Sequence, residues 1–371
     1  MAENASDSNS PGKGEAALQP LRERIDELDQ QIVKLLNERA NVVVEIGHIK
    51  RTGAAPIYAP DREQAVLEQV RRYNQGPLPD PCLEAIWREL MSGSFALERP
   101  LRVGYLGPPG SFSHLAARRK FGASVEYDNL DDIAAVFEEI GRGHIDYGLV
   151  PIENSAIGGI GETLDAFLNS DGQVCAEVLI TIHHNLLSNS PPEEIKRICS
   201  KPEVFAQCRK WLSVQLHHAE KVPVASSSKA AEIAAREPGT AAIASTLAGD
   251  MYGLKVQFAN IEDNPQNTTR FFVIGKQAAK PTGDDKTSIM FTTEHQAGSL
   301  VAVLDVLRDY GLNMTHIDKR PSKRVNWEYY FFVDLVGHQS DPQMRRALDE
   351  ARKHCLQLTV LGSFPRAREV L

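Results

Sequence analysis

The chain has 371 residues, of which 42% are hydrophobic and 24% are charged, and its formal net charge is −8. This composition is typical of a globular protein, and the length predicts roughly two to four domains. The negative charge argues against a nucleic-acid partner. No run approaches the ~18 apolar residues of a membrane span, and the N-terminus lacks a signal-peptide core. We therefore expect a cytoplasmic protein without a membrane partner.

The cysteines and histidines argue against disulfides and metal. The five cysteines are odd in number and contain no C-x-x-C pair, which is typical of free, buried thiols in a reducing compartment. The pairs His183-His184 and His217-His218 lack a cysteine or acidic residue at ligand spacing, so no metal site is expected.

The N-terminal region is predicted to be helical. Residues 1–18 are rich in Ser, Gly, Ala and Asn, which predicts a disordered tail. From 19 to 51 apolar residues recur at helical spacing, and shorter helices are expected over 61–73 and 80–98. The first helix would be about 45 Å long, and its apolar stripe is too long for one small domain to cover. We therefore expect an all-helical domain over 19–99 that pairs with a second chain.

The periodicity changes after Arg99-Pro100. Short apolar runs alternate with helical patterns over 101–277, which predicts an α/β domain large enough for two lobes around a cleft. A polar linker with Pro281 and Gly283 follows. Residues 286–365 then show the order strand, helix, two strands, helix, strand, which predicts a ferredoxin-like βαββαβ domain. The expected fold class is multidomain: all-α, then two-lobed α/β, then ferredoxin-like.

Three cations stand out in the helical domain. Arg39 and Lys50 are 11 residues apart, so they differ by only about 20° around the helix and share a face. Arg22 lies about 100° away and could join them only from a neighbouring antiparallel helix. The simpler alternative is three solvated cations on a charged helix.

This spacing resembles the all-helical chorismate mutase family over about residues 19–99. The resemblance implies that Arg22 crosses a dimer interface and that Arg39 and Lys50 bind the substrate, chorismate. The rearrangement to prephenate needs no nucleophile, metal or cofactor, because fixed donors stabilise the charge that develops on an ether oxygen. The other implied site residues are Arg62, Glu63, Ser94 and Glu98.

Two positions depart from the family pattern. An acidic residue often precedes the second helix, and here the position is Ala59, which leaves the contact with the substrate hydroxyl to Glu63. The second donor to the ether oxygen is often Gln, and here it is Glu98. An ionised carboxylate would repel the developing charge, so our hypothesis is that Glu98 acts in its protonated form. The alternatives are a surface glutamate at a helix end and an inactive mutase domain.

A glycine run in the α/β region invites a nucleotide-binding interpretation. Gly104, Gly107 and Gly110 follow a predicted strand and precede a helix. Their spacing is not G-x-G-x-x-G, and Pro108 and Pro109 lack the amides that a pyrophosphate would use. We expect no nucleotide site there.

Four separated segments instead resemble prephenate dehydratase over about residues 101–277: Gly107–Ala117, Pro151–Gly159, Ser227–Ala231 and Thr268–Phe272. The resemblance implies two α/β lobes, similar to periplasmic binding proteins. One lobe would comprise about 101–178 with a returning segment near 262–277, and the other about 180–258.

The resemblance also implies roles for single residues. Thr269 would donate a hydrogen bond to the leaving hydroxyl of prephenate or relay a proton to it. Arg270 would hold a carboxylate or support the threonine. Asn154 and Ser155 would line the opposite wall. Ser227 and Ser228 would open a helix whose N-terminus faces the substrate, with a simple N-cap role as the alternative.

Two further residues of these segments have open roles. His114 either fixes its turn or touches substrate. Glu153 is either a structural acid at a helix start or a second proton source.

Two C-terminal motifs resemble the ligand contacts of the ACT regulatory domain, which binds phenylalanine between paired domains. Gly298-Ser299-Leu300-Val301 opens a helix, and Asp318-Lys319-Arg320-Pro321 ends a strand. The family forms are more often Gly-Ala-Leu-Val and Glu-Ser-Arg-Pro, so Ser299, Asp318 and Lys319 are departures. We expect phenylalanine feedback, and the alternative is a dimerisation module without a ligand.

The whole chain therefore resembles the bifunctional P-protein family, in which chorismate mutase is joined to prephenate dehydratase. The resemblance implies conversion of chorismate to prephenate and then to phenylpyruvate, without cofactor. It also implies a homodimer or larger assembly with interlocked mutase helices. The leading alternative is a non-enzymatic two-lobed sensor of small molecules with a helical dimerisation arm and an effector domain.

Overall fold

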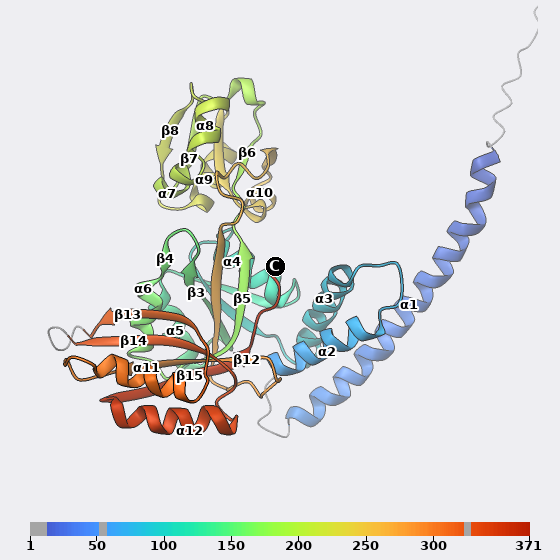
Figure 1. Cartoon of the computed structure of the whole chain (residues 1–371). Coiled ribbons are helices and arrows are strands. Elements are labelled where there is room, and N and C mark those ends of the chain that lie inside the picture. The colour runs from blue at the N-terminus through green and yellow to red at the C-terminus, as the bar shows by residue number, and fades with distance from the viewer. Residues whose placement is uncertain (1–12, 52–57, 323–327) are drawn as a thin grey trace, which may run out of the picture. The chain divides into compact units, whose positions relative to one another are not determined.

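The computed structural model describes residues 13–51, 58–322 and 328–371 (Figure 1). These residues form two compact units. One contains helix α1, Lys13–Arg51, together with Leu97–Arg99, and the other contains the rest of the described chain. Figure 1 shows α1 as one continuous helix. Because α1 begins at Lys13, the predicted disordered tail over 1–18 was wrong for residues 13–18, and residues 1–12 lie outside the described part.

Helices α2, Pro60–Tyr73, and α3, Asp80–Glu98, match the predicted boundaries within one residue. The ends of α2 follow from its sequence. Pro60 occupies the first turn, where a missing amide hydrogen costs nothing, and Asp61 lies near the positive end of the helix dipole. Arg71 and Arg72 lie in the last turn, near the negative end.

The first α/β lobe is built on one mixed sheet. Its strand order is β2-β1-β3-β11-β5, with β4 beside β3. The strands are β1 Arg102–Leu106, β2 Glu126–Leu130, β3 Tyr147–Asn154, β4 Gly158–Gly159, β5 Gln173–Thr181 and β11 Thr268–Gly275. The helices are α4 Phe112–Phe121, α5 Ile133–Arg142 and α6 Gly161–Phe167. Strand β11 returns from the second lobe and pairs antiparallel with both β3 and β5, so it lies inside the sheet.

The second lobe has its own five-stranded sheet in the order β10-β6-β9-β7-β8. Its strands are β6 Asn185–Ser188, β7 Arg197–Ser200, β8 Glu220–Pro223, β9 Thr240–Ala244 and β10 Lys255–Phe258. Its helices are η1 Pro192–Glu194, α7 Pro202–Gln207, α8 Arg209–Gln215, α9 Ser227–Arg236 and α10 Thr246–Tyr252. The prediction of two lobes with a returning segment is confirmed.

The two lobes are joined by two antiparallel crossings of the chain (Figure 1). The amide of Ile182 donates to the carbonyl of Asn267 at 2.7 Å, and the amide of Ile261 donates to the carbonyl of His184 at 2.8 Å. Such paired backbone bonds satisfy the polar groups of two connections that run side by side. Strand β11 begins immediately after the second crossing.

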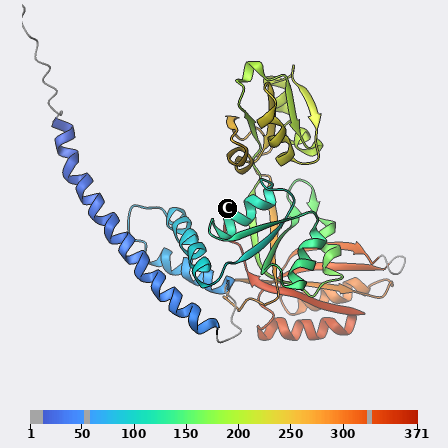
Figure 2. The same cartoon turned by 180° about the vertical axis from the view of Figure 1, so that it is seen from behind.

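The C-terminal domain has the predicted βαββαβ order, with a sheet ordered β13-β14-β12-β15. Its elements are β12 Asp285–Thr292, α11 Ser299–Asp309, β13 Met314–Pro321, β14 Tyr329–Val336, α12 Pro342–Ala351, η2 Arg352–His354 and β15 Gln357–Pro365. Both helices lie on one face of the sheet in both views (Figure 1 and Figure 2).

Both faces of this C-terminal sheet are covered. Phe291 and Val333 pack in a cluster with residues of the two helices. Met290 and Phe332, whose side chains alternate with these, pack in a cluster with residues of the first lobe. This explains why β12 is buried almost throughout instead of alternating between buried and exposed residues.

The chain ends beside the first lobe. The amide of Leu371 donates to the carbonyl of Leu179 at 2.8 Å, so the last residues run along β5. All five cysteines are free thiols, as predicted, but Cys82 is exposed and Cys355 is only half-buried. Among the described residues, no helix is long and apolar enough to cross a membrane.

Candidate functional site

Thr269 and Arg270 open β11, the strand that follows the second interlobe crossing. Successive side chains on a strand point to opposite faces of the sheet, so the two residues cannot serve one pocket. The strand pairing shows this division. Thr269 lies opposite Asn154 of β3, and the register shifts between Arg270 and Phe271. Such bulges re-aim side chains and are common beside active sites.

Thr269 belongs to a buried polar cluster at the interlobe crossing. The side-chain amide of Asn154 donates to Thr269 Oγ1 at 2.8 Å and to Asn267 Oδ1 at 2.8 Å. Asn154 Oδ1 accepts from two backbone amides, those of Ala156 and Ile157. Both ends of the Asn154 amide are therefore committed, which fixes its orientation.

The bond from Asn154 has a chemical consequence for Thr269. A threonine hydroxyl has one donor hydrogen and accepting lone pairs, and here a lone pair is used. The hydroxyl hydrogen of Thr269 is not used in this bond, so it is available to donate to a departing hydroxide. Thr269 retains 8% of its surface, so it is not sealed off.

The neighbouring Ser155 is exposed and stabilises the start of β11. Its hydroxyl oxygen accepts from the amide of Thr268 at 2.9 Å. Together with the pairing of Thr269 to Asn154, this brings three predicted dehydratase residues to one place. The predicted contact of Asn154 and Ser155 with substrate stays a prediction.

Arg270 points to the other side of β11, where two of its three nitrogens face carboxylates and Nη2 has no hydrogen-bond partner among the described residues. Its Nε donates to Glu177 Oε2 at 2.8 Å, and its Nη1 lies 2.6 Å from Asp334 Oδ2. Burial acts to lower the pKa of Arg270, but the carboxylates of Asp334 and Glu177 outweigh it and the pKa is raised. Of the two predicted roles for Arg270, the geometry favours support of the threonine over a direct contact with a substrate carboxylate.

Ser227 and Ser228 lie in the first turn of α9, in the second lobe. The N-cap is Ser226, whose side chain accepts from the amide of Lys229 at 3.0 Å, so the alternative N-cap role for Ser227 and Ser228 was wrong. The hydroxyl of Ser228 instead donates to the carbonyl of Pro109 in the first lobe. Ser227 is buried beside it.

The turn at Pro109-Gly110 explains the last glycine of the run in this part of the sequence. Gly110 has a φ of +85°, and a Cβ there would lie 3.1 Å from Ser228 Oγ and 3.2 Å from the Cα of Ala248. Only glycine allows this backbone conformation and this close approach between the lobes. The hydroxyl of Ser245 also donates to the carbonyl of Gly110 at 2.9 Å.

His114 fixes the same turn. Its Nδ1 accepts from the amide of Gly110 at 3.1 Å, and its ring stacks on Tyr105 with 4.5 Å between ring centroids. Burial, with a smaller contribution from Arg118, lowers the pKa of His114 to about 4. These contacts account for His114 without a substrate.

In the first unit, the predicted mutase cations lie along α1. Arg22 is exposed and Arg39 is half-buried, whereas the side chain of Lys50 lies outside the described part. Glu98 packs against α1, because a Cβ on Gly47 would lie 3.1 Å from Glu98 Cγ. Positions 39 and 50 are about 80° and about 60° from position 47 around the helix. Glu98 therefore contacts α1 near the face that carries both positions.

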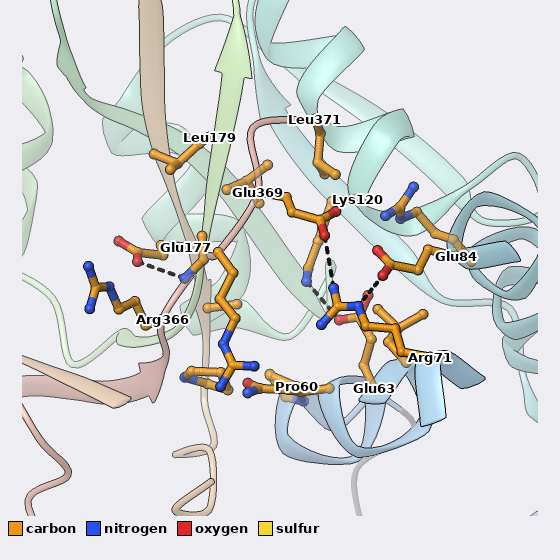
Figure 3. Close-up of a pocket in the computed structure, with 18 residues that line it drawn as sticks. Pro60, Glu63, Arg71, Glu84, Lys120, Glu177, Leu179, Arg366, Glu369 and Leu371 are labelled. Atoms are coloured by element: carbon orange, nitrogen blue, oxygen red, sulfur yellow. Dashed lines mark hydrogen bonds and ion pairs between the residues drawn. The ribbon is translucent and has the colours of Figure 1, made fainter. Parts of the chain in front are cut away.

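In the second unit, Glu63 is not open to solvent. It is 8% exposed, accepts from the hydroxyl of Tyr58 at 2.9 Å and pairs with Lys120 of α4 at 2.7 Å (Figure 3). Burial, then the nearby Glu63 carboxylate, raises the pKa of Tyr58 well above its ordinary value. The predicted contact of Glu63 with substrate would require it to exchange Lys120 for the substrate hydroxyl.

The other two predicted mutase residues of the second unit differ in exposure. Arg62 is exposed on α2, and the half-buried Ser94 donates to the carbonyl of Leu90 at 2.8 Å. The hydroxyl of Ser94 thus bonds to its own helix, one turn back.

Sequence reasoning missed the charged cavity that surrounds Glu63. The cavity has a volume of about 120 Å³ and is lined by α2, α3, β5 and the C-terminal segment (Figure 3). Arg71 bridges the carboxylates of Glu84 and Glu369 within it. The lining comes from segments far apart in the sequence, so no local motif could have revealed it.

The predicted effector residues are divided between α11 and β13. Gly298 precedes α11 with a φ of +88°, where glycine is favoured, and Val301 is exposed. Ser299 and Leu300 are half-buried in the first turn. On β13, Arg320 forms a bidentate pair with Asp165 of α6 at 3.0 and 2.9 Å.

Asp318 also faces the first lobe. It lies so close to Gly159 that a Cβ there would overlap its carboxylate. Asp318 and Arg320 of the β13 motif thus both contact the lobe that carries Thr269.

The fold and this site define a class of protein: a two-lobed α/β domain with a polar cluster at its interlobe crossing, preceded by helices and followed by a βαββαβ domain. Three family models match in the same order. They are chorismate mutase type II over residues 21–99, prephenate dehydratase over 103–279 and the ACT domain over 287–353.

Full-length relatives share all three regions. A bifunctional chorismate mutase/prephenate dehydratase from Stutzerimonas stutzeri is 42% identical over 94% of this chain and 98% of its own length. The protein of that description from Escherichia coli K12 is 32% identical over 95% of this chain and 97% of its own. The chain therefore belongs to the bifunctional chorismate mutase/prephenate dehydratase family.

Solved structures resemble the dehydratase and C-terminal regions. A prephenate dehydratase from Arthrobacter aurescens, in complex with L-Phe, has a TM-score of 0.67 and 30% identity, covering 72% of this chain and 90% of that chain. GqqA, described as a novel type of quorum-quenching acylase, has a TM-score of 0.67 and 26% identity, covering 72% of this chain and 98% of that chain. The fold alone therefore does not define the chemistry, and the site residues must.

Proposed function

We propose that the chain rearranges chorismate to prephenate in its helical domain and converts prephenate to phenylpyruvate in its α/β domain. The family membership over almost the whole chain supports both activities. The observation that carries the second activity is the hydrogen bond from Asn154 to Thr269 Oγ1, which leaves the hydroxyl hydrogen of Thr269 available for another acceptor.

The dehydratase step requires a carboxylate and a hydroxyl to leave one ring. The bond between the ring and its carboxylate breaks, carbon dioxide leaves, and the electron pair forms a ring double bond. The ring hydroxyl departs as water after it receives a proton, and aromatisation drives the step. A threonine hydroxyl is too weak an acid to supply that proton alone, so Thr269 donates a hydrogen bond or relays a proton from a water molecule.

The mutase step requires only positioning and charge. Arg39, Lys50 and the partner's copy of Arg22 would hold the two carboxylates and the reactive conformer. Lys50 and a protonated Glu98 would donate to the ether oxygen as the C–O bond breaks. The packing of Glu98 against α1 near Gly47 supports its place in this site.

A second copy of the chain is the partner that the helical domain needs. The apolar residues of α1 are exposed, among them Leu21, Ile25, Leu28, Ile32, Leu35 and Ile49. A stripe of this length is stable in water only when another apolar surface covers it. We propose a homodimer through α1, in a cytoplasmic setting that fits the free thiols.

The C-terminal domain would bind phenylalanine and report it to the dehydratase site. The ACT family match and the retained Gly298 and Arg320 support this role. The effector acts only if it binds one arrangement of the domain better than another. Phenylalanine that bound without changing prephenate turnover would argue against the regulatory role.

One assay tests both activities. Purified protein is mixed with chorismate or with prephenate, and the loss of each substrate and the formation of phenylpyruvate are followed. We expect turnover of both. Turnover of prephenate alone would indicate an inactive mutase domain, and turnover of neither would favour the sensor.

A further inference from the structure

The surroundings of Arg270 join the dehydratase strand to the C-terminal domain. Arg270 retains 7% of its surface and contacts Glu177 of β5 and Asp334 of β14. Glu177 lies diagonally from Arg270 on the same face of the first-lobe sheet, because Arg270 is paired with Leu179. Asp334 belongs to a different sheet, in the ACT domain.

Both carboxylates have further partners that fix them in place. Glu177 is 3.0 Å from Lys286 of β12 and accepts from the amide of Ala367 at 2.9 Å. Asp334 accepts from the hydroxyl of Ser288, also on β12. The carboxylates are 4% and 3% exposed as residues. Removing one partner of a buried ion pair leaves the other charge uncompensated, so a displaced member is costly. Arg270 Nη2 and Asp334 Oδ2 are buried without a hydrogen-bond partner among the described residues, so the Arg270–Asp334 contact is an ion pair and not a full set of hydrogen bonds.

This network holds Arg270 on β11, directly next to Thr269. Thr269 and Arg270 are consecutive, and their side chains leave the strand in opposite directions. The bulge between Arg270 and Phe271 interrupts the ladder on the β3 side. The anchored guanidinium therefore contributes to the rotation of the strand that aims the Thr269 hydroxyl.

We propose that Arg270 is a positioning residue for Thr269 and that Asp334, from the ACT domain, holds it in place. The proposal rests on the function proposed above, in which Thr269 acts on prephenate. The ACT sheet then completes the dehydratase machinery, in addition to its regulatory role. A substrate carboxylate has no part in this role of Arg270.

The same arrangement connects the effector motif to the site. Asp334 is paired with His316 of β13, and that strand continues to Asp318 and Arg320. A displacement of β13 relative to β14 would change the position of Asp334 directly. Through the ion pair between Asp334 and Arg270, it would also change the position of Thr269.

The central experiment is Asp334→Asn in the full-length protein, assayed with prephenate. We expect kcat to fall about tenfold, with KM within about twofold, because the threonine is misaligned while substrate binding is kept. Mutase turnover in the same sample should be unchanged, which controls for folding. Arg270→Lys keeps the charge but loses the planar fork, and we expect a fall in kcat of the same kind.

Two further variants keep the test decisive. Ser288→Ala removes one hydrogen bond to Asp334 and should lower kcat by a smaller factor, even if Asp334→Asn folds poorly. Asp349→Asn is the matched control, because Asp349 forms an exposed pair with Arg352 in the same domain and should leave both activities unchanged.

The outcomes distinguish failure of the proposed function from failure of the positioning role of Arg270. If the wild type fails to convert prephenate, the proposed function fails. If the wild type converts prephenate and Asp334→Asn and Ser288→Ala have unchanged kcat, the positioning role is overturned. A raised KM at constant kcat in Arg270→Lys would overturn it too, since Arg270 would then bind substrate.

Discussion

The helical domain and the α/β domain differ in how they bury their apolar side chains. On the part of α1 from Leu28 to Ile49, seven large apolar residues are between 42% and 73% exposed: Leu28, Ile32, Val33, Leu35, Val42, Ile46 and Ile49. In the α/β lobes, strands β3, β9 and β11 bury almost every residue between neighbouring strands and covering helices. In the proposed homodimer the first region is covered by a second chain, whereas the second closes its core within one chain.

This difference also separates the two candidate sites. The Thr269 cluster is assembled from β3, β11 and the segment before β11, so a single chain completes it. The proposed mutase site needs Arg22 from a partner copy. Changes that act on association should therefore abolish one activity and spare the other.

The largest expected effect tests the single-chain site. Thr269→Val keeps the shape of the side chain and removes the hydroxyl, so dehydratase kcat should fall by about 10²–10⁴, while chorismate consumption is unchanged. Steady-state assays with each substrate measure both. Thr268→Val, one residue earlier and half-buried, is the control and should retain dehydratase activity. A Thr269→Val protein with normal prephenate turnover would remove the threonine from the mechanism.

A charged substitution in the exposed apolar stripe of α1 tests the proposed mutase site, which needs two chains. Ile32→Asp should weaken association and lower mutase activity by roughly 10-fold or more at low protein concentration, because a charge would be buried in the dimer interface. Dehydratase activity should persist. Sedimentation velocity together with both assays checks this, and Gln30→Asp on the opposite face of α1 is the control. Dimers and mutase activity that survive Ile32→Asp would contradict this interface.

The role of Glu98 can be tested by the pH dependence of mutase activity. If Glu98 donates only when protonated, mutase kcat should fall as pH rises, and Glu98→Gln should flatten the falling limb, since an amide donates at every pH. We expect a difference of a few-fold at the alkaline end. The dehydratase profile of the same variant is the internal control. An unchanged falling limb in Glu98→Gln would exclude Glu98 as its source.

The smallest expected effect concerns the stability of the α/β domain in acid. His114 has its pKa lowered to about 4, so the unfolded state binds a proton near pH 6.5 before the folded state does. Stability should therefore fall as pH decreases from about 6.5 to about 4, by on the order of 1–2 kcal/mol.

Urea unfolding at several pH values measures this change. In His114→Asn, whose side-chain oxygen can still accept from Gly110, the pH dependence should be weaker. His217→Asn, at an exposed position, is the control and should match the wild type. Equal pH dependence in wild type and His114→Asn would rule out this histidine as the source.

Much of the fold was predictable because the relevant signals are local. The helical period over 19–51 and the order of the βαββαβ domain depend on neighbouring residues, and the structure confirms them. The start of α1 at Lys13 and the N-cap at Ser226 were missed. Both are boundary effects, where a polar segment adjoins a helix and several residues compete for the end.

The ion pairs that hold the charged residues of the candidate sites were not predictable from the sequence. Glu63 pairs with Lys120, Arg320 with Asp165, and Arg270 with Asp334, and each pair joins residues from different domains. No periodicity or motif links such positions, because the distance along the chain says nothing of how two sheets meet.

The sequence by itself determined which residues carry chemistry and which family the chain resembles, since those depend on residue type and spacing. Only the tertiary structure decided that Thr269 and Arg270 face opposite ways, one toward Asn154 and the other toward the ACT domain. The physical reason is that strand alternation separates neighbours, while burial of a charge requires partners that only the packing of distant strands can supply.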